Sequence, residues 1–149
     1  MGQPKKNIEQ AISSISTAHH IKVNKTASYY RSKAWGGIEQ QDFINTVIEI
    51  STLLDPNQLL NAMQSIENGM GREKTLKWGP RIIDIDILLY DQFVVNEPHL
   101  VIPHRYLTER YFVLVPLNEI NGTLFIPNKG KLADFIDQKL VEKEILLIK

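Results

Sequence analysis

The spacing of hydrophobic residues in the first third of the chain predicts one helix followed by two strands. Over residues 7–16 the hydrophobic residues recur at helical intervals, and Pro4 lies just upstream, where helices tolerate proline. Residues 21–31 are rich in Val, Thr, Ser and Tyr, and residues 43–50 alternate between two faces, so both segments are expected to be strands. They would form a hairpin-like unit around the loop that contains Gly36 and Gly37.

A second amphipathic helix is expected in the middle of the chain. Asp55 and Pro56 form a helix-start signal, and Gly69 with Gly71 offers an exit from the helix. Between these ends the hydrophobic residues recur every three or four positions, as is typical of a helix with one buried face. They are Leu59, Leu60, Met63 and Ile66.

Residues 82–90 alternate between hydrophobic and acidic side chains, which predicts a strand with one polar face. Asp84 and Asp86 would lie on that polar face. Residues 93–102 are then expected to return as the hairpin partner of this strand. The opposite, hydrophobic face would be formed by Ile83, Ile85, Ile87 and Leu89.

The C-terminal third predicts two more helices and a short strand. Residues 106–115 are expected to form a helix that Pro116 ends, and residues from 131 to 140 carry hydrophobic side chains at helical intervals. Ile145–Ile148 is expected to be a strand. Together these segments predict an α+β fold in a single domain, residues 1–149, in which helices pack on an antiparallel sheet.

Composition narrows the classes of function. The 17 basic residues balance the 17 acidic ones, so no overall charge attracts nucleic acid or an acidic membrane. The chain has no cysteine, which excludes disulfides and thiolate chemistry and fits a cytoplasmic protein. The N-terminus lacks an apolar signal core, and no apolar run approaches the roughly 20 residues of a membrane span. A soluble protein with no nucleic-acid or membrane partner is expected.

Two aspartates form the first candidate site. Asp84 and Asp86 would lie on one side of a strand with Cα atoms roughly 6.6 Å apart, close enough for both carboxylates to bind the same hard cations. Mg²⁺ is typically held by one or two carboxylates together with water and substrate phosphates. A solvated strand face explains the same spacing equally well, because many antiparallel sheets expose one polar face.

Basic and aromatic residues around this pair could bind a phosphorylated, flat substrate. Arg81 precedes the strand and Arg72 and Lys74 lie in the loop before it, which suits a phosphate clamp, although surface salt bridges are a common alternative. His104 and Arg110 carry the same ambiguity. Aromatic side chains could stack on a heterocycle whose edge Asn45 reads, or they could be core residues: Phe43, Trp78 and Phe112.

Sequence motifs identify a family. The chain contains no phosphate-binding loop of the Gly-x-x-x-x-Gly-Lys-Ser/Thr type and no His-Glu-x-x-His zinc motif. The run WGPRIIDIDILLY, residues 78–90, closely resembles the signature of 6-hydroxymethyl-7,8-dihydropterin pyrophosphokinase, a family of folate biosynthesis. The resemblance extends over nearly the whole chain, through residues 43–45, 64–67, 71–72, 100–104 and 109–117.

The resemblance implies an ATP-dependent diphosphotransferase. The family transfers the β,γ-pyrophosphoryl unit of ATP to the hydroxymethyl group of a reduced pterin and releases AMP. Asp84 and Asp86 would then hold two Mg²⁺ ions, and Arg72 and Arg81 would act with them in catalysis. The residues implied in ATP binding are Gln64, Glu67, Arg72, Lys74, Trp78, Arg81, His104 and Arg110, and those implied in pterin binding are Phe43, Asn45 and Phe112.

The resemblance also implies a ferredoxin-like sheet with helices on both sides, in a monomer. Family members usually begin with an apolar strand that ends in Gly-Ser-Asn, and this chain is expected to lack that N-terminal strand. Residues 33–35 replace a proline-rich loop, and residues 72–78 are one residue short. A catalytically impaired pterin- or nucleotide-binding relic is the alternative to an active enzyme, and a ferredoxin-like nucleic-acid binder is disfavoured by the balanced charge.

Overall fold

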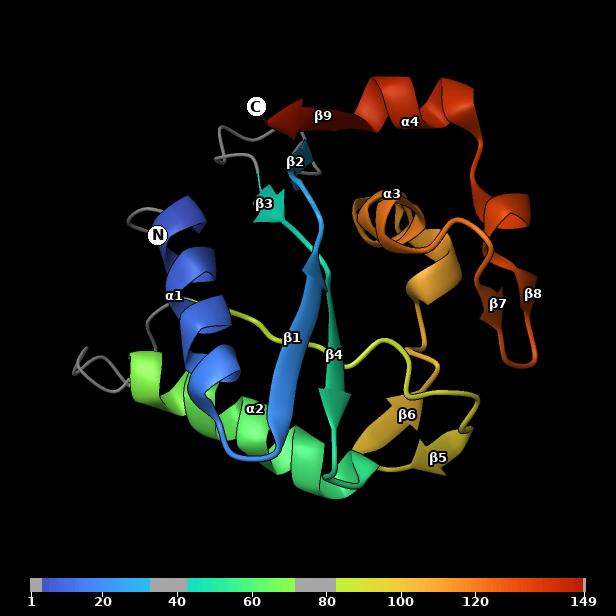
Figure 1. The fold of residues 1–149 in the computed structure, drawn as a ribbon. Coiled ribbons are helices and arrows are strands. Elements are labelled where there is room, and N and C mark those ends of the chain that lie inside the picture. Colours follow the sequence, from blue (N-terminus) through green and yellow to red (C-terminus); the bar gives the residue numbers. More distant parts are fainter. Residues whose placement is uncertain (1–3, 33–42, 72–82, 149) are drawn as a thin grey trace.

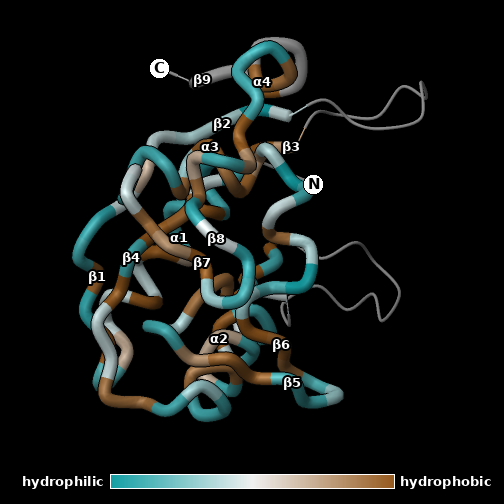
Figure 2. Tube along the Cα trace, turned by 90° about the vertical axis from the view of Figure 1, so that its right-hand side faces the viewer, coloured by the Kyte–Doolittle hydropathy of each residue, from teal (hydrophilic) through white to brown (hydrophobic). Residues whose placement is uncertain are grey.

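The computed structural model describes residues 4–32, 43–71 and 83–148. Within these ranges it contains four α-helices and nine short strands, and every strand pair is antiparallel, which confirms the α+β class (Figure 1). In both views β2, β3, β9, α3 and α4 lie at one end of the molecule and α2, β5 and β6 at the other (Figures 1 and 2).

The first predicted helix is confirmed as α1, Pro4–Thr17, which buries Ile8, Ala11 and Ile15 on one face. The predicted strand over residues 21–31 is instead broken into β1, Ile21–Thr26, and β2, Tyr29–Ser32. The strand predicted over residues 43–50 is also broken, into β3 and β4. The bounds of these two strands are Phe43–Asn45 and Ile48–Thr52.

Hydrogen bonds join the two strand breaks to each other. The amide of Ala27 donates to the carbonyl of Val47 at 2.9 Å, and the hydroxyl of Thr46 donates to the carbonyls of Ala27 and Ser28, each at 3.0 Å. Both broken segments, β1–β2 and β3–β4, therefore pass from one sheet to the other at the same place. On one side of the break β1 pairs with β4, and on the other β2 lies between β3 and β9, Ile145–Ile148.

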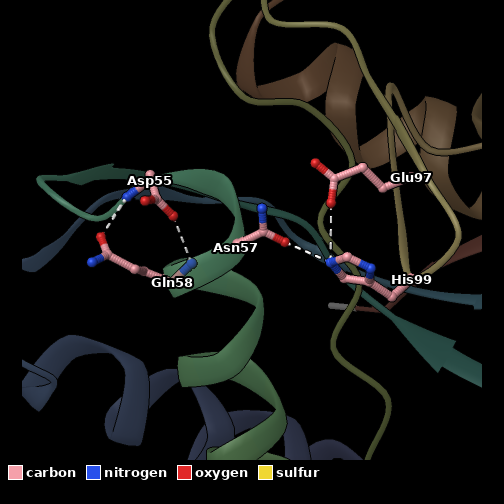
Figure 3. A network of polar contacts seen from close by, with 5 residues as sticks. All are labelled: Asp55, Asn57, Gln58, Glu97 and His99. Carbon is pink, nitrogen blue, oxygen red and sulfur yellow. Dashed lines mark hydrogen bonds and ion pairs between the residues drawn. The ribbon is translucent and has the colours of Figure 1, made fainter.

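The second predicted helix is confirmed as α2, Pro56–Gly71, and it begins with a reciprocal cap. The Gln58 amide donates to Asp55 Oδ1 at 2.8 Å, and the Asp55 amide donates to Gln58 Oε1 at 3.0 Å (Figure 3). Beside this cap, His99 Nε2 lies 2.7 Å from Asn57 Oδ1 and 3.2 Å from Glu97 Oε2. The ring of His99 thereby connects the start of α2 to the next hairpin.

That hairpin consists of β5, Val95–Glu97, and β6, Leu100–Ile102, which pair with each other. The prediction that residues 93–102 return beside a strand over residues 82–90 is therefore wrong. Residues 83–90 form no strand, because a strand requires a neighbouring backbone partner and this segment pairs with none of the described strands. A cavity of about 250 Å³ lies where the end of this segment approaches β4 and α2. The cavity is lined by Ile50, Ser51, Thr52, Leu59, Leu89, Tyr90 and Asp91.

The helix predicted over residues 106–115 is wrong at both ends. A 3-10 turn, η1, spans Leu107–Glu109, and α3 then runs from Tyr111 to Ile120 with Pro116 inside it. A proline inside a helix costs about 3 kcal/mol, whereas burying a leucine side chain contributes about 1.5–3 kcal/mol. Because Leu114 and Leu117 are both buried, their burial is large enough to offset the proline.

The C-terminal region contains an additional hairpin that the sequence did not predict, formed by β7, Phe125–Ile126, and β8, Gly130–Lys131. The helix predicted from residue 131 is divided into a 3-10 turn, η2, Leu132–Phe135, and a short helix, α4, Gln138–Glu144. Asp137 separates the two, and its side chain caps α4 by accepting from the Lys139 amide at 2.9 Å. The predicted final strand is confirmed as β9.

Two hydrophobic clusters stabilise the two sides of the molecule. One lies between α1, α2 and the β1–β4 pair, and the other between η1, α3 and η2. Figure 2 shows brown hydrophobic and teal hydrophilic residues following each other along β1 and β4. The buried members of the first cluster are Ile15, Ile21, Leu59 and Met63, and those of the second are Leu107, Leu114, Leu117, Ile126 and Leu132.

The Glu119 carboxylate at the end of α3 binds the chain where β1 ends and β2 begins. Glu119 Oε2 accepts from the Ser28 amide at 2.8 Å and from the Ser28 hydroxyl at 3.0 Å, and Glu119 Oε1 accepts from the Tyr30 hydroxyl. Burial, followed by the bond to Glu119, raises the pKa of Tyr30 to about 12. The bonds from Tyr30 and Ser28 outweigh burial and lower the pKa of Glu119.

We expect Tyr30→Phe to weaken the fold and to change its response to alkali. The lost hydrogen bond to a charged group corresponds to about 1.5–3 kcal/mol in the free energy of unfolding at neutral pH. Because the folded-state pKa of Tyr30 is raised from 10.0 to about 12, its contribution is complete below pH 10 and is lost as the pH rises toward 12. Urea unfolding measured between pH 7 and pH 12 should therefore show a shallower alkaline decline for this variant.

Tyr106→Phe is the matched control for this measurement, because the Tyr106 side chain is exposed. It should lose stability between pH 10 and pH 12 as the wild type does. Equal alkaline declines for Tyr30→Phe and the wild type would show that the Tyr30 hydroxyl does not couple its proton to folding.

Candidate functional site

The segment that carries the two aspartates keeps the alternation that its sequence predicts, although it is not a strand. Asp84 and Asp86 are exposed, while Ile83, Ile85 and Ile87 are half-buried. Figure 1 shows this yellow-green segment crossing the β1–β4 pair at about mid-height. Both carboxylates therefore lie on the solvent side of an extended chain whose other side packs against the core.

Helix α2 holds this segment through one carboxylate. Glu67 Oε2 accepts from the backbone amide of Ile85 at 2.7 Å. Ile85 lies between the two aspartates, so this single bond fixes the part of the backbone that carries both of them. Charge-assisted hydrogen bonds of this kind are about twice as strong as neutral ones.

His104 approaches the same segment from β6. Its backbone amide donates to the carbonyl of Leu88 at 2.9 Å, and its Nε2 lies 4.0 Å from Asp86 Oδ2. Burial lowers the pKa of His104, and the cations Arg110 and Arg105 add to that effect against the opposing charge of Asp86. The imidazole is therefore neutral at pH 7, and at this distance it acts as a dipole beside Asp86.

Arg110 lies between two aromatic rings at the start of α3. Its guanidinium carbon is 5.0 Å from the centre of the Tyr106 ring and 5.6 Å from that of Phe112. The His104 and Tyr106 rings are 6.2 Å apart. Successive contacts thus lead from Asp86 to His104, Tyr106, Arg110 and Phe112. Stacking on the Tyr106 and Phe112 rings holds the Arg110 guanidinium without neutralising its charge.

The other two predicted pterin residues lie on β3. Phe43 and Asn45 occupy alternate positions of this strand and so point to the same face, and the Phe43 side chain is 56% exposed. Phe43 is therefore not a core residue. An exposed aromatic ring and an amide on one strand face can stack on a flat ring and read its edge.

The structure describes most but not all of the predicted site. Gln64 is exposed on α2, one turn before Glu67, so α2 presents both side chains on one face. The loops over residues 33–35 and 72–78 lie outside the described residues. Four of the predicted site residues also lie outside them: Arg72, Lys74, Trp78 and Arg81.

The donor set of the aspartate pair fits a hard divalent cation. Two exposed carboxylates that share one side of the backbone offer only oxygen ligands. No group of three or more acidic or histidine side chains suited to a metal ion occurs in residues 4–32, 43–71 and 83–148. This composition suits Mg²⁺, which keeps several waters and takes further ligands from substrate phosphates.

Three residues that support the site were not indicated by the sequence patterns. Tyr106 supports Arg110, and Tyr30 and Glu119 join β2 to α3. Tyr106 lies two residues after His104, and that proximity was a signal. Tyr30 and Glu119 are 89 positions apart, so their pairing had no local signal.

Comparisons with known proteins identify the family of this chain. The family model of 7,8-dihydro-6-hydroxymethylpterin-pyrophosphokinase matches residues 1–122. The 2-amino-4-hydroxy-6-hydroxymethyldihydropteridine pyrophosphokinase of Haemophilus influenzae is 37% identical over 147 residues, which cover 99% of this chain and 92% of that protein.

Two further relatives carry the same name. The protein of Methylorubrum extorquens is 42% identical over 116 residues, or 78% of this chain and 73% of its own length. That of Bacillus subtilis is 38% identical over 120 residues, or 80% of this chain and 72% of its own length. The matched region contains the aspartate pair, Glu67, His104, Arg110 and β3. The chain therefore belongs to the 7,8-dihydro-6-hydroxymethylpterin-pyrophosphokinase family.

Proposed function

We propose that this protein transfers pyrophosphate from ATP to the hydroxymethyl group of 6-hydroxymethyl-7,8-dihydropterin in folate biosynthesis, giving AMP and the pterin diphosphate. The observation that carries the proposal is the pair of exposed aspartates, Asp84 and Asp86, on a backbone that Glu67 holds by the amide between them. Family membership and the relatives' shared name support the same reaction.

Asp84 and Asp86 are the residues that would hold magnesium, with two ions expected alongside ATP. Bound there, the ions would supply neutralisation of the negative charge on the transferring phosphates. The protein's own contribution is to present both carboxylates on one side of the chain. Their exposure leaves them accessible to cations from the solvent.

The residues proposed to bind ATP surround the aspartate segment on two sides. Helix α2 supplies Gln64 and Glu67, and the segment after β6 supplies His104 and Arg110. The neutral His104 can donate or accept one hydrogen bond without repelling a cation, whereas Arg110 brings a permanent positive charge for phosphate oxygens. Their proposed partners outside the described residues are Arg72, Lys74, Trp78 and Arg81, with Arg72 and Arg81 as catalytic cations.

The pterin is proposed to bind between β3 and the start of α3. Phe43 and Phe112 offer aromatic faces to the flat ring, and Asn45 offers an amide to its hydrogen-bonding edge. Arg110 contacts the Phe112 ring, so the phosphate-binding and pterin-binding groups are neighbours. This proximity is what an in-line transfer needs, because catalysis of phosphoryl transfer depends mainly on positioning and electrostatics.

The broader arrangement is proposed to be ferredoxin-like, in a single-domain, cytoplasmic monomer. Antiparallel strands with helices packed against them support the fold, and two hydrophobic clusters that both pack against the segment of residues 83–90 support one domain. The absence of cysteine is consistent with a reducing compartment. No helix of the described residues is long and apolar enough to cross a membrane.

Asp84→Ala or Asp86→Ala should abolish the reaction while the protein stays folded. Loss of a metal ligand removes several kcal/mol of transition-state stabilisation, which corresponds to a loss of about a thousandfold or more in kcat. The measurement is the rate of AMP formation from ATP and the hydroxymethyl-dihydropterin in the presence of Mg²⁺, monitored by chromatography. Asp134→Ala changes another exposed aspartate, on η2, and should retain full activity.

Formation of ADP in place of AMP would contradict pyrophosphate transfer. Binding of pterin and ATP without any product would favour the non-catalytic relic. Full activity in both aspartate variants would place the metal elsewhere.

Glu67→Ala should weaken the metal site without removing a metal ligand. The Ile85 amide would lose its acceptor, and loss of such supporting bonds typically costs 10- to 100-fold in metal affinity. Glu67→Gln keeps a side-chain oxygen as acceptor and should retain most of the affinity. Mn²⁺ binding followed by electron paramagnetic resonance provides a readout that needs no turnover.

Glu9→Ala, an exposed glutamate on α1, is the matched control and should bind Mn²⁺ as the wild type does. If Glu67→Ala binds Mn²⁺ normally but loses ATP affinity, the Glu67 carboxylate acts on the nucleotide and not on the aspartate segment.

A further inference from the structure

Tyr30 belongs to two different contacts that meet at the proposed pterin site. In the antiparallel ladder it is the direct register partner of Asn45, so the two residues are opposite each other on β2 and β3. Its hydroxyl donates to Glu119 at the end of α3. The Tyr30 side chain is 8% exposed, and its bond to the exposed Glu119 is partly buried. Tyr30 therefore connects two elements: its backbone pairs with the strand that carries Asn45, and its side chain binds the helix that carries Phe112.

A second route connects the same two walls through Ser28. Its amide and hydroxyl both donate to Glu119, and its carbonyl accepts from the hydroxyl of Thr46, the residue after Asn45. The Glu119 carboxylate thus receives three hydrogen bonds from two residues of the β-strand side. These three directional bonds fix the Glu119 carboxylate relative to Ser28 and Tyr30, in addition to the nondirectional packing of the leucines along α3.

The geometry of α3 carries this restraint to the other wall. Glu119 and Phe112 lie seven residues apart on one helix, which places them two turns and about 10 Å apart along the axis. Pro116 lies between these two residues and lacks the amide that would bond the Phe112 carbonyl, so the buried packing of Leu114, Pro116 and Leu117 has to keep these two turns together. Strand β2 pairs with β3 and also contacts α3, so a shift of α3 relative to β2 changes its distance from β3.

We propose that Tyr30, Ser28 and Glu119 are positioning residues that set the separation between the two walls of the pterin site, with Asn45 and Phe43 on β3 as one wall and Phe112 on α3 as the other. This inference rests on the proposed function, because it names the pterin as the molecule that the gap fits. The three residues touch neither the substrate nor the metal. They act through the strand and the helix that they join.

The test compares Tyr30→Phe with Tyr29→Phe, its neighbour on the opposite face of β2. Binding of the fluorescent pterin and of a nonhydrolysable ATP analogue is measured separately, well below the melting temperature. We expect Tyr30→Phe to raise the Kd for pterin about tenfold, because even a misplacement of about 1 Å can cost about a hundredfold in catalysis, and to leave the Kd for the ATP analogue unchanged. Tyr29→Phe should change neither.

Ser28→Ala and Glu119→Gln provide independent variants. Ser28→Ala removes only one of the three hydrogen bonds to Glu119 and is expected to disturb the fold least. If Tyr30→Phe fails to fold, the pterin affinity of Ser28→Ala tests the inference instead. Unchanged pterin affinity in folded variants that merely melt earlier would overturn the inference. Equal weakening of pterin and ATP binding would also overturn it, because that result indicates general loosening of the protein.

Hydrogen exchange in the ligand-free protein separates this inference from the proposed function. Tyr30→Phe should speed exchange of the amides of β3 and of the last turn of α3, while the amides of the β5–β6 hairpin keep their wild-type rates. Absence of AMP formation by the wild type would reject the proposed function alone. Unchanged exchange at β3 and α3 would reject the positioning role alone.

Discussion

The Glu119 carboxylate is the contact on which the arrangement of the site depends. It accepts three hydrogen bonds at the point where both strands of the N-terminal unit break and change sheet. The break itself would leave backbone groups unpaired, and Thr46 and Ala27 satisfy some of them from across it. The helix that carries Phe112 is thereby attached to the strand break, so the fold and the proposed pterin site share one set of bonds.

A second carboxylate, that of Glu67, fixes the segment that carries the proposed metal ligands. Glu67 binds the amide between the two aspartates, and His104 binds the carbonyl of Leu88 farther along the same segment. These two contacts hold an extended chain in place where the described residues provide no ladder of strand hydrogen bonds. Exposed carboxylates on a restrained backbone suit a site that must bind and release highly charged ligands, because binding then requires little desolvation or ordering of the protein.

Local patterns predicted those elements whose stability is local. The helices at Pro4–Thr17 and Pro56–Gly71 follow from hydrophobic periodicity and, for the second, from its cap. The alternation predicted over residues 82–90 is confirmed in the exposure of residues 83–87, and the strand predicted there is wrong, because pairing depends on a distant neighbour. Pro116 was expected to end a helix, and the burial of Leu114 and Leu117 overrides that local preference.

By itself, the sequence determined the family and the reaction and indicated the aspartate pair as the candidate metal site, because side-chain chemistry and its spacing along a short motif are written in the chain. Only the tertiary structure decided which residues support that motif. Glu67 meets Ile85 across 18 positions, and Tyr30 meets Glu119 across 89. Such contacts form through packing of separate elements, and no periodicity or local spacing records which carboxylate will meet which donor once the elements have packed.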